Sequence, residues 1–391
     1  LVGLILGAIL GIAVPQATGI AILGDVFVSA LKAIAPLLVF FLVISSLCNA
    51  GKSHGGVIKT VIILYMFSTV LAAVIAVFAS MAFPVKMTLA NAATDTSAPQ
   101  GIVEVLNNLL LNVVANPVSS LVNANYVGIL MWAVLLGLAF RAADKMTKKV
   151  LADVADGISM VVTWIINLAP FGIFGLVFNT VSTNGLDIFT TYGKLLILLV
   201  GCMLFIYFVT NPLLVYWCIR QNPYPLIFHC LKRSALTAFF TRSSAANIPV
   251  NMKVCEEMGL DRDTYSVTIP LGATINMDGA AITITVMTMA TAFTLGIHVD
   301  IPTAIILSLL AALSACGASG VAGGSLLLIP MACSLFGISD DISMQVVAVG
   351  FIIGVVQDSV ETALNSSSDL LLSASAEFRQ WRLEGKEIKF K

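Results

Sequence analysis

ISMQVVAVGFIIGVVQDSVETALNSSSDL, residues 342–370, is an apolar run that carries a regular set of polar side chains. These side chains, which we call the acidic stripe, are Asp358, Glu361, Thr362, Asn365 and Asp369. Their offsets of 3, 4, 7 and 11 residues from the first place them all on one face of a helix. Carboxylates at bilayer depth are costly and usually functional. The acidic stripe therefore predicts a buried helix that needs cations nearby.

The whole chain has the composition of a helical membrane protein. It is 59% apolar and 10% charged, with a mean hydropathy of +1.00. A net charge of -1 without a basic stripe gives no indication of nucleic-acid binding. The seven cysteines show no CxxC spacing, which argues against a disulfide framework or a zinc site. The chain starts inside an apolar run, so we expect that earlier residues of the protein are missing from it.

We predict an all-α polytopic membrane protein with about eight transmembrane helices and two re-entrant helical hairpins. Each long apolar run approaches the ~20 residues needed to cross a bilayer. Residues 85–125 are more polar and are expected to include an exposed loop. The predicted segments are 1–15, 27–49, 57–84, 101–140 (broken), 155–181, 188–217, 225–255, 263–295, 301–336 and 342–370.

Lysine and arginine cluster in alternate loops, which predicts the orientation of the chain. By the positive-inside rule, the basic loops and both termini are cytoplasmic. The basic loops alternate sides consistently only if 225–255 and 301–336 each enter and leave the membrane on the same side. The first would then enter from the cytoplasm and the second from outside. Two such hairpins, each followed by a functional helix, form an inverted repeat, which transporters use to build a site near the midplane.

The first predicted hairpin reverses at Thr241-Arg242-Ser243-Ser244. A reversal inside a membrane frees backbone groups that need partners. Helix N-termini beyond the turn would offer N–H groups to a carboxylate. A cytoplasmic loop between two short helices is the alternative interpretation.

The motif Asn276-Met277-Asp278-Gly279 interrupts an otherwise regular helix. Asn, Asp and Gly together favour local unwinding. Unwound carbonyls, the Asp278 carboxylate and the Asn276 amide are oxygen ligands that suit a small hard cation such as sodium. The alternative is a kink at which Asp278 pairs with a basic residue.

The small-residue tract 317–325 predicts the tip of the second hairpin, or alternatively a close helix-packing face. Its Gly317-Ala318-Ser319-Gly320 matches a short intramembrane serine protease pattern, but the three histidines all precede Ser319. Asp278 and Asp358 lack the GxGD context of intramembrane aspartyl proteases. We therefore predict that the chain is not an enzyme.

Charge counting predicts bound cations. Only one basic residue, Arg242, is expected at membrane depth. Four acidic residues are expected there: Asp278, Asp358, Glu361 and Asp369. Such a negative excess at low dielectric requires bound cations or protonation. Two to three sodium ions would neutralise it. If bound cations assemble the pocket to which the substrate then binds, cation binding and substrate binding are coupled.

Together these motifs resemble the dicarboxylate/amino acid:cation symporter family, which includes the glutamate transporters. The likeness covers nearly the whole chain, is densest over 225–370 and is greatest to the bacterial serine/threonine:sodium branch. The resemblance implies three sodium sites. One would use the backbone of Gly272 and Asn276 with Asn365 and Asp369. The second would use the backbone of Thr274 and Met277 with carbonyls near 316–318. The third would use Tyr65, Ser68, Thr69, Asn276 and Asp278.

The resemblance also implies the substrate pocket. Asp358 would meet the α-amino group, and Asn365 with the backbone near Ser243 and Ser244 would meet the α-carboxylate. Thr362 would line the pocket, with Arg242 and Val321 contributed by the hairpin tips.

The family fold implies a homotrimer in the bacterial inner membrane and a transport domain that slides as an elevator. The trimerisation scaffold would comprise 27–49 and 101–181, within an N-terminal part spanning 1–224. The transport core would be 225–370, followed by a cytoplasmic tail, 371–391.

Glu361 departs from the acidic-substrate pattern of this family, in which an arginine pairs with the substrate's side-chain carboxylate. Glu361 would repel that carboxylate but could accept a hydrogen bond from the hydroxyl of serine or threonine. Alternatively, it is protonated or tied to Arg242. Two competing functions are a proton- or sodium-coupled carrier of acidic amino acids or C4-dicarboxylates, which Glu361 disfavours, and an ion channel with the acidic stripe as its selectivity ring.

Overall fold

The computed structural model describes residues 2–49, 56–89, 111, 114–123, 125–185, 187–316 and 323–388. Within these ranges every regular element is helical. Five of the described helices are long and apolar enough to cross a membrane, or six if the bent pair α7 and α8 forms one span. The predicted all-helical membrane class is confirmed at this level. The predicted segments 1–15 and 301–336 and the end of 101–140 contain shorter apolar helices. Residues 101–110 of the predicted segment 101–140 lie outside the described residues.

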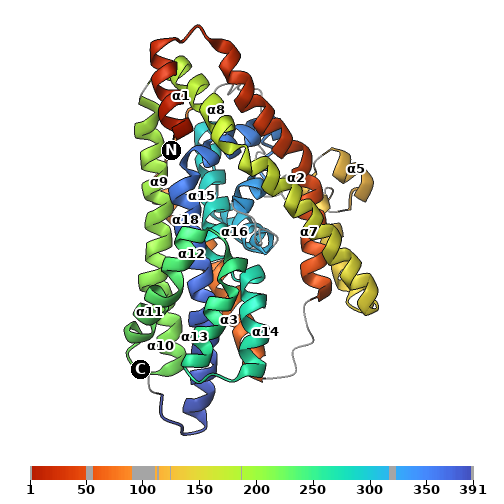
Figure 1. Ribbon diagram of the computed structural model, residues 1–391, viewed down its shortest axis with the longest axis vertical. Helices are drawn as coiled ribbons and strands as arrows, with labels where there is room; N and C mark the ends of the chain where they lie inside the picture. The colour runs from red at the N-terminus through yellow and green to blue at the C-terminus, as the bar shows by residue number, and fades with distance from the viewer. Residues whose placement is uncertain are drawn as a thin grey trace.

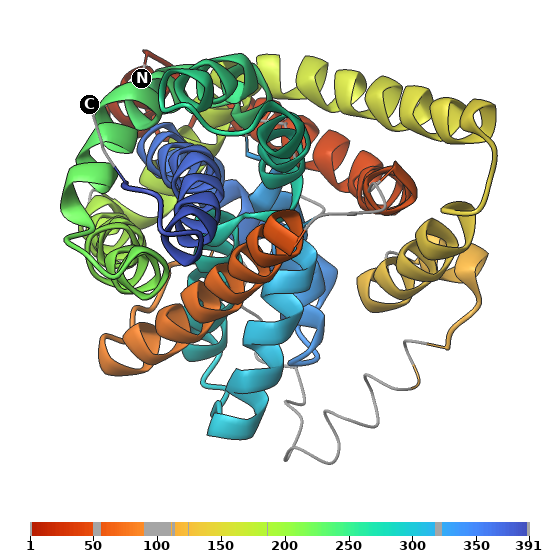
Figure 2. The same cartoon turned by 90° about the horizontal axis from the view of Figure 1, so that it is seen from below.

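One set of helices packs mainly on itself, and we call it the outer group. Helix α2 (Ala21–Asn49) contacts α6 (Tyr126–Phe140), α7 (Lys145–Asn167) and α8 (Ala169–Asn184). Helix α1 (Val2–Ala13) lies along α8, and the short α5 (Pro117–Val122) lies on α6. In Figures 1 and 2, the far ends of α2 and α7 extend away from the body of the molecule.

The other helices form the core group around α18 (Asp340–Leu383). These are α3 (Gly56–Ala82), α9 (Asp187–Phe205), η2 (Ile206–Thr210), α10 (Asn211–Ile219) and the elements from residue 224 onward. The outer and core groups meet where α18 contacts α2 and α8, and where α17 (Ile329–Ser334) contacts α6. Two bodies with a limited seam between them are therefore visible in the packing (Figure 1).

The first predicted hairpin is present as two antiparallel arms. One arm contains α11 (Tyr224–Cys230), η3 (Leu231–Ala235) and α12 (Leu236–Thr241), and the other is α13 (Ser244–Glu257). Arg242 ends α12 in the left-handed conformation, with φ 50°. Ser243 then caps α13, its Oγ accepting a hydrogen bond from the Ala246 N–H at 3.2 Å. The reversal thus falls within the predicted motif.

The predicted broken helix is confirmed. Helix α14 (Arg262–Ile275) stops and α15 (Asp278–Thr294) begins after two non-helical residues, Asn276 and Met277. Beyond it, α16 (Ile301–Ala315), η4 (Gly324–Leu328) and α17 form the arms of the second hairpin. The tip residues 317–322, including Val321, lie outside the described residues.

Two segments differ from the sequence prediction. Predicted span 155–181 is two helices, α7 and α8, which meet at 51° near the Ala169-Pro170 start of α8. A proline at a helix start fixes the first turn and cannot continue the preceding hydrogen-bond ladder. The last helix, predicted as 342–370, runs on to Leu383, because Leu371, Leu372 and Phe378 remain buried in the core group. Much of the predicted tail is thus helical.

Candidate functional site

The acidic stripe lies inside the core group. Its five side chains, Asp358, Glu361, Thr362, Asn365 and Asp369, are between 1% and 6% exposed. They project from α18 toward the break between α14 and α15 and toward both hairpins. The stripe therefore joins the three interruptions in the membrane helices, where backbone and side-chain polar groups are available for binding.

The C-terminal end of the stripe is tied to the helix break. The Asn276 Nδ2 donates to Asp369 Oδ1 at 2.9 Å and to Ser368 Oγ at 3.0 Å. The Tyr65 hydroxyl donates to the Asp369 carbonyl at 2.9 Å. Gly272 leaves room for this arrangement, since a Cβ there would lie 2.8 Å from both Asp369 Oδ1 and the Tyr65 hydroxyl. Four of the predicted cation-site residues are therefore in one place.

Asp278 forms a second buried carboxylate site against α3. Its two oxygens accept hydrogen bonds from Ser68 Oγ at 2.7 Å and Thr69 Oγ1 at 3.1 Å. Thr69 Oγ1 in turn accepts from the Met277 N–H at 3.2 Å. Asp278 and both hydroxyls are fully buried. The alternative that Asp278 pairs with a basic residue is not supported, because the side chains that donate to its carboxylate are the hydroxyls of Ser68 and Thr69.

The oxygen atoms around the helix break suit a hard cation. Asn276 Oδ1 is buried and has no hydrogen-bond partner among the described residues, so an acceptor oxygen lies beside two buried carboxylates. In the described part of the chain, no group of three or more His, Cys, Asp or Glu side chains could hold a metal. A cation here would be bound by mixed carboxylate, amide, hydroxyl and backbone oxygens, the ligand type that hard cations prefer.

The predicted second sodium site is only partly described. Thr274 Oγ1 donates to the Leu271 carbonyl of its own helix at 2.7 Å. The predicted cation ligand is the backbone of Thr274, not this hydroxyl. Cys316 Sγ lies 3.7 Å from the Ile275 carbonyl, so the second hairpin does reach the helix break. Residues 317 and 318 lie outside the described residues.

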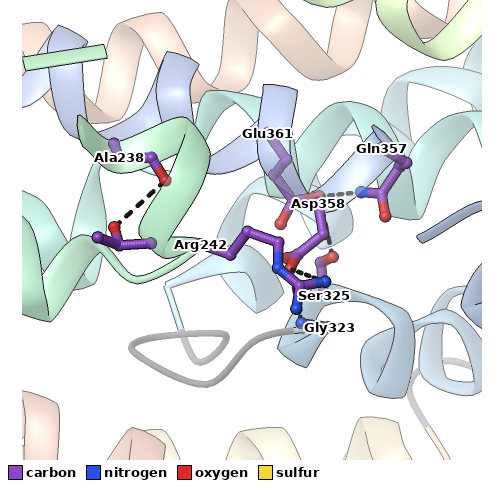
Figure 3. Close-up of polar contacts among 8 residues, drawn as sticks. Ala238, Arg242, Gly323, Ser325, Gln357, Asp358 and Glu361 are labelled. Carbon is purple, nitrogen blue, oxygen red and sulfur yellow. Dashed lines mark hydrogen bonds and ion pairs between the residues drawn. The ribbon is translucent and has the colours of Figure 1, made fainter. Parts of the chain in front are cut away.

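The N-terminal end of the stripe faces a cleft. Asp358 Oδ1 accepts from the Gly323 N–H at 3.1 Å, and Asp358 Oδ2 lies 4.0 Å from Arg242 Nη1 (Figure 3). The cleft measures about 530 Å³ and is lined by α1, α7, α8 and α18, together with Arg242 and Gly323. The tips of both hairpins thus meet one carboxylate at the seam between the outer and core groups.

Glu361 is held by neutral donors from three elements. Its Oε2 accepts from Thr283 Oγ1 at 2.6 Å, Ser325 Oγ at 3.0 Å and Gln357 Nε2 at 2.5 Å. The ion pair of Arg242 is with Asp358, so the alternative that ties Glu361 to Arg242 is not what the structure shows. Figure 3 shows Ser325 and Gln357 converging on Glu361 beside Asp358.

Asn365 links the two ends of the stripe. Its Oδ1 accepts from the Gly279 N–H at 2.7 Å, and its Nδ2 lies 3.5 Å from Met277 Sδ. A Cβ at Gly279 would lie 2.9 Å from Glu361, so α15 approaches α18 closely at this point. Thr362 is buried on the same face. Asn365 therefore contacts the two residues that flank Asp278 at the start of α15.

Several site residues were not identified from the sequence. Thr283, Ser325 and Gln357 all bind Glu361. Gln357 stands four residues before Glu361 in the same apolar run, and that helical spacing is a signal that could have identified it. Nothing in the spacing of Thr283 or Ser325 relates them to Glu361, because both contacts are tertiary.

A second unpredicted cluster fixes the first hairpin to α18. Asn247 Nδ2 donates to Ser234 Oγ at 2.9 Å and to Ser366 Oγ at 2.8 Å. Asn251 Nδ2 donates to the Ser366 carbonyl at 2.8 Å. All four residues are buried. Buried amides spaced by four residues were the available signal, since such groups need partners.

The chain is similar to known proteins over nearly its whole length. The model of the sodium:dicarboxylate symporter family matches residues 1–377. The serine/threonine transporter SstT of Bifidobacterium adolescentis is 58% identical over 389 residues, 99% of this chain and 90% of that protein. The SstT of Streptococcus thermophilus is 55% identical over 382 residues, covering 97% and 95%. The SstT of Streptococcus agalactiae is 58% identical over 377 residues, covering 96% and 94%.

Proposed function

The chain belongs to the sodium:dicarboxylate symporter family, and from that premise we propose that it imports serine and threonine together with sodium. It is a membrane transporter and not an enzyme, as predicted. The substrate follows the names of relatives that are 55–58% identical over nearly the whole chain.

The environment of Glu361 is the observation that carries the choice of substrate. A carboxylate surrounded by two hydroxyls and an amide is an acceptor for neutral donors. A substrate with a side-chain carboxylate would place like charges together in a buried site, which is unfavourable by several kcal/mol. A substrate hydroxyl would instead donate to Glu361. Asp358, at the cleft, would receive the α-amino group, and Asn365 with the capped start of α13 near Ser243 and Ser244 would receive the α-carboxylate.

Sodium is the co-transported ion, and two to three ions are expected per cycle. The oxygen groups of Asp369, Asn276 and Gly272 would hold one ion, and those of Asp278, Ser68 and Thr69 another. Coupling has a physical route, because Asn276 connects the helix break to Asp369 at one end of the stripe and Asn365 connects it to the middle of the stripe. Ions that fix the break would favour the pocket geometry to which the substrate binds.

The division into outer and core groups supports an elevator mechanism. The outer group would act as the scaffold of a homotrimer, and the core group would carry the pocket across the membrane of a bacterial cell. A cleft at the seam reaches Asp358, and alternating access would open this pocket to one side of the membrane at a time. Both termini would be cytoplasmic.

Uptake into proteoliposomes tests the function directly. Labelled serine, threonine, aspartate and succinate would be offered with an inward sodium gradient, with choline in its place, and with a proton gradient. We expect serine and threonine to accumulate with sodium alone as the driving ion. Aspartate or succinate uptake driven by protons would instead identify the acidic-substrate alternative, and conductance without any amino acid would identify a channel.

A further inference from the structure

Ser325 places a hydroxymethyl side chain against the carboxylate assigned to substrate recognition. It lies in η4, directly after Gly323 and Gly324 of the second hairpin, and is 1% exposed. Its Oγ is 3.0 Å from Glu361 Oε2. The side chain of serine, the proposed substrate, is the same group. The protein thus holds a chemical equivalent of its substrate's side chain at the specificity position.

One of the two carboxylate oxygens of Glu361, Oε2, is already fully used. Oε2 receives hydrogen bonds from Thr283, Ser325 and Gln357. A carboxylate oxygen has two lone pairs, and about four acceptor positions are shared by the whole group. A fourth donor on the same oxygen would require one of the three to leave.

Of the three donors, Ser325 is the one placed to leave. Thr283 lies in α15 and Gln357 lies one turn before Glu361 on α18. Gln357 Nε2 also donates to Thr283 Oγ1 at 2.8 Å, so these two donors hold each other in place beside Glu361, whereas Ser325 has no such second contact among the described hydrogen bonds. Ser325 belongs to a five-residue turn of the hairpin, whose neighbouring Gly323 N–H also binds Asp358.

We propose that Ser325 is an internal competitor for the substrate hydroxyl: it donates to Glu361 until a hydroxyl amino acid replaces it. This inference rests on the proposed function. Its consequence is that the affinity for serine is lowered by the bond that must be broken, whereas an amino acid without a hydroxyl leaves that bond intact. Displacing Ser325 also releases one of the hairpin's contacts with α18, which links substrate recognition to hairpin movement.

The test compares serine with alanine binding in Ser325→Ala at saturating sodium, by isothermal titration of the purified protein. A hydrogen bond to a charged group contributes enough that its loss changes an equilibrium about tenfold. We expect the preference for serine over alanine to rise about tenfold in the variant. Effects on the hairpin that are common to both amino acids cancel in this ratio.

Two further variants serve as controls. Ser325→Thr retains the hydroxyl and should restore the wild-type ratio. Ser308→Ala makes the same change in α16 of the same hairpin, where the Ser308 hydroxyl is buried and donates only to the Ala304 carbonyl among the described contacts. It should leave the ratio unchanged.

The outcomes separate the inference from the proposed function. An unchanged ratio in Ser325→Ala would overturn the proposal that Ser325 competes with the substrate. The substrate hydroxyl would then bind elsewhere, for example at the other carboxylate oxygen of Glu361. A lower ratio would also overturn it, because Ser325 would then be positioning Glu361 for the substrate. Wild-type protein that binds neither serine nor threonine would overturn the proposed function itself.

A second measurement applies if the variant binds alanine too weakly to titrate. Hydrogen exchange over 323–334, with sodium and without amino acid, should increase in Ser325→Ala relative to wild type. Adding serine should remove the difference, since the displaced contact is then absent from both proteins. Exchange that is equal in both proteins before serine is added would contradict the proposal.

Discussion

The two ends of the acidic stripe are built differently. At the Asp369 end, the carboxylate accepts from the Asn276 amide and packs beside Gly272, and the Tyr65 hydroxyl donates to the Asp369 main-chain carbonyl, deep between α3, α14 and α18. At the Asp358 and Glu361 end, both carboxylates meet residues of the second hairpin, and Asp358 lines a cleft. The first end is built by α3, α14 and α18, whereas the second also takes contacts from the two hairpins through Arg242, Gly323 and Ser325.

This difference indicates how one helix can serve two ligands. Eight residues, or about 12 Å of helix rise, separate Asp369 from Glu361. Sites at that distance change nearly independently unless they share partners. We therefore expect substitutions at the Asp369 end to alter sodium dependence and those at the Glu361 end to alter substrate choice.

Asp369→Asn should have the largest effect. Removing one charge from a buried ionic site costs about 3–5 kcal/mol, so the sodium concentration for half-maximal serine uptake should rise on the order of several hundredfold. Sodium titration of proteoliposome uptake measures it. A sodium response like that of wild type would remove Asp369 from the cation sites.

Glu361→Arg should change the substrate rather than the ion. Reversing the charge replaces a repulsion of acidic side chains with an attraction, and the preference for aspartate over serine should rise on the order of 100-fold. Competition of unlabelled aspartate with labelled serine gives the ratio. Retention of wild-type selectivity would separate Glu361 from the substrate.

Gly272→Ala tests the close packing at the cation end. The added Cβ would lie 2.8 Å from Asp369 Oδ1 and the Tyr65 hydroxyl, and overpacking of this kind costs about 1–3 kcal/mol. Apparent sodium affinity should fall about tenfold with serine-over-alanine preference unchanged. Gly201→Ala is the matched control, because a Cβ there meets nothing within 4 Å. Equal effects of the two variants would contradict the assignment.

Ser366→Ala should have the smallest effect. It removes one acceptor of Asn247, which keeps its bond to Ser234, so stability should fall by about 1 kcal/mol. Thermal unfolding in detergent measures the loss, and neither sodium affinity nor selectivity should move. A change in selectivity would show that the first hairpin also determines the substrate.

Local signals in the sequence were sufficient for the interruptions of the helices. Asn276 and its neighbours predicted the break, and the Arg242 motif predicted the hairpin turn, because unwinding depends on residues next to each other in the chain. The acidic stripe was predicted for the same reason: its period is that of one helix. The Pro170 signal at the α8 start was present but was not used.

Contacts between distant segments could not be predicted in this way. The pairing of Arg242 with Asp358, and the donors on Glu361 from α15 and η4, depend on how the helices pack. The continuation of α18 to Leu383 depends on a neighbouring surface, seen where Arg382 Nε donates to the Cys218 carbonyl at 3.1 Å. The sequence of α18 alone does not indicate that its C-terminal end packs against the segment that contains Cys218.

The separation of the two ends is tested most directly by the sodium dependence of serine uptake in Glu361→Gln. This variant removes the charge at the pocket end and retains a side chain of similar size. Because coupling makes the sodium half-saturation depend on bound serine, both proteins are measured at saturating serine. We predict a sodium half-saturation within about twofold of wild type, together with a reduced preference for serine over alanine. A large shift in sodium half-saturation, like that expected for Asp369→Asn, would show that Glu361 belongs to the cation sites and would contradict the separation of the two ends.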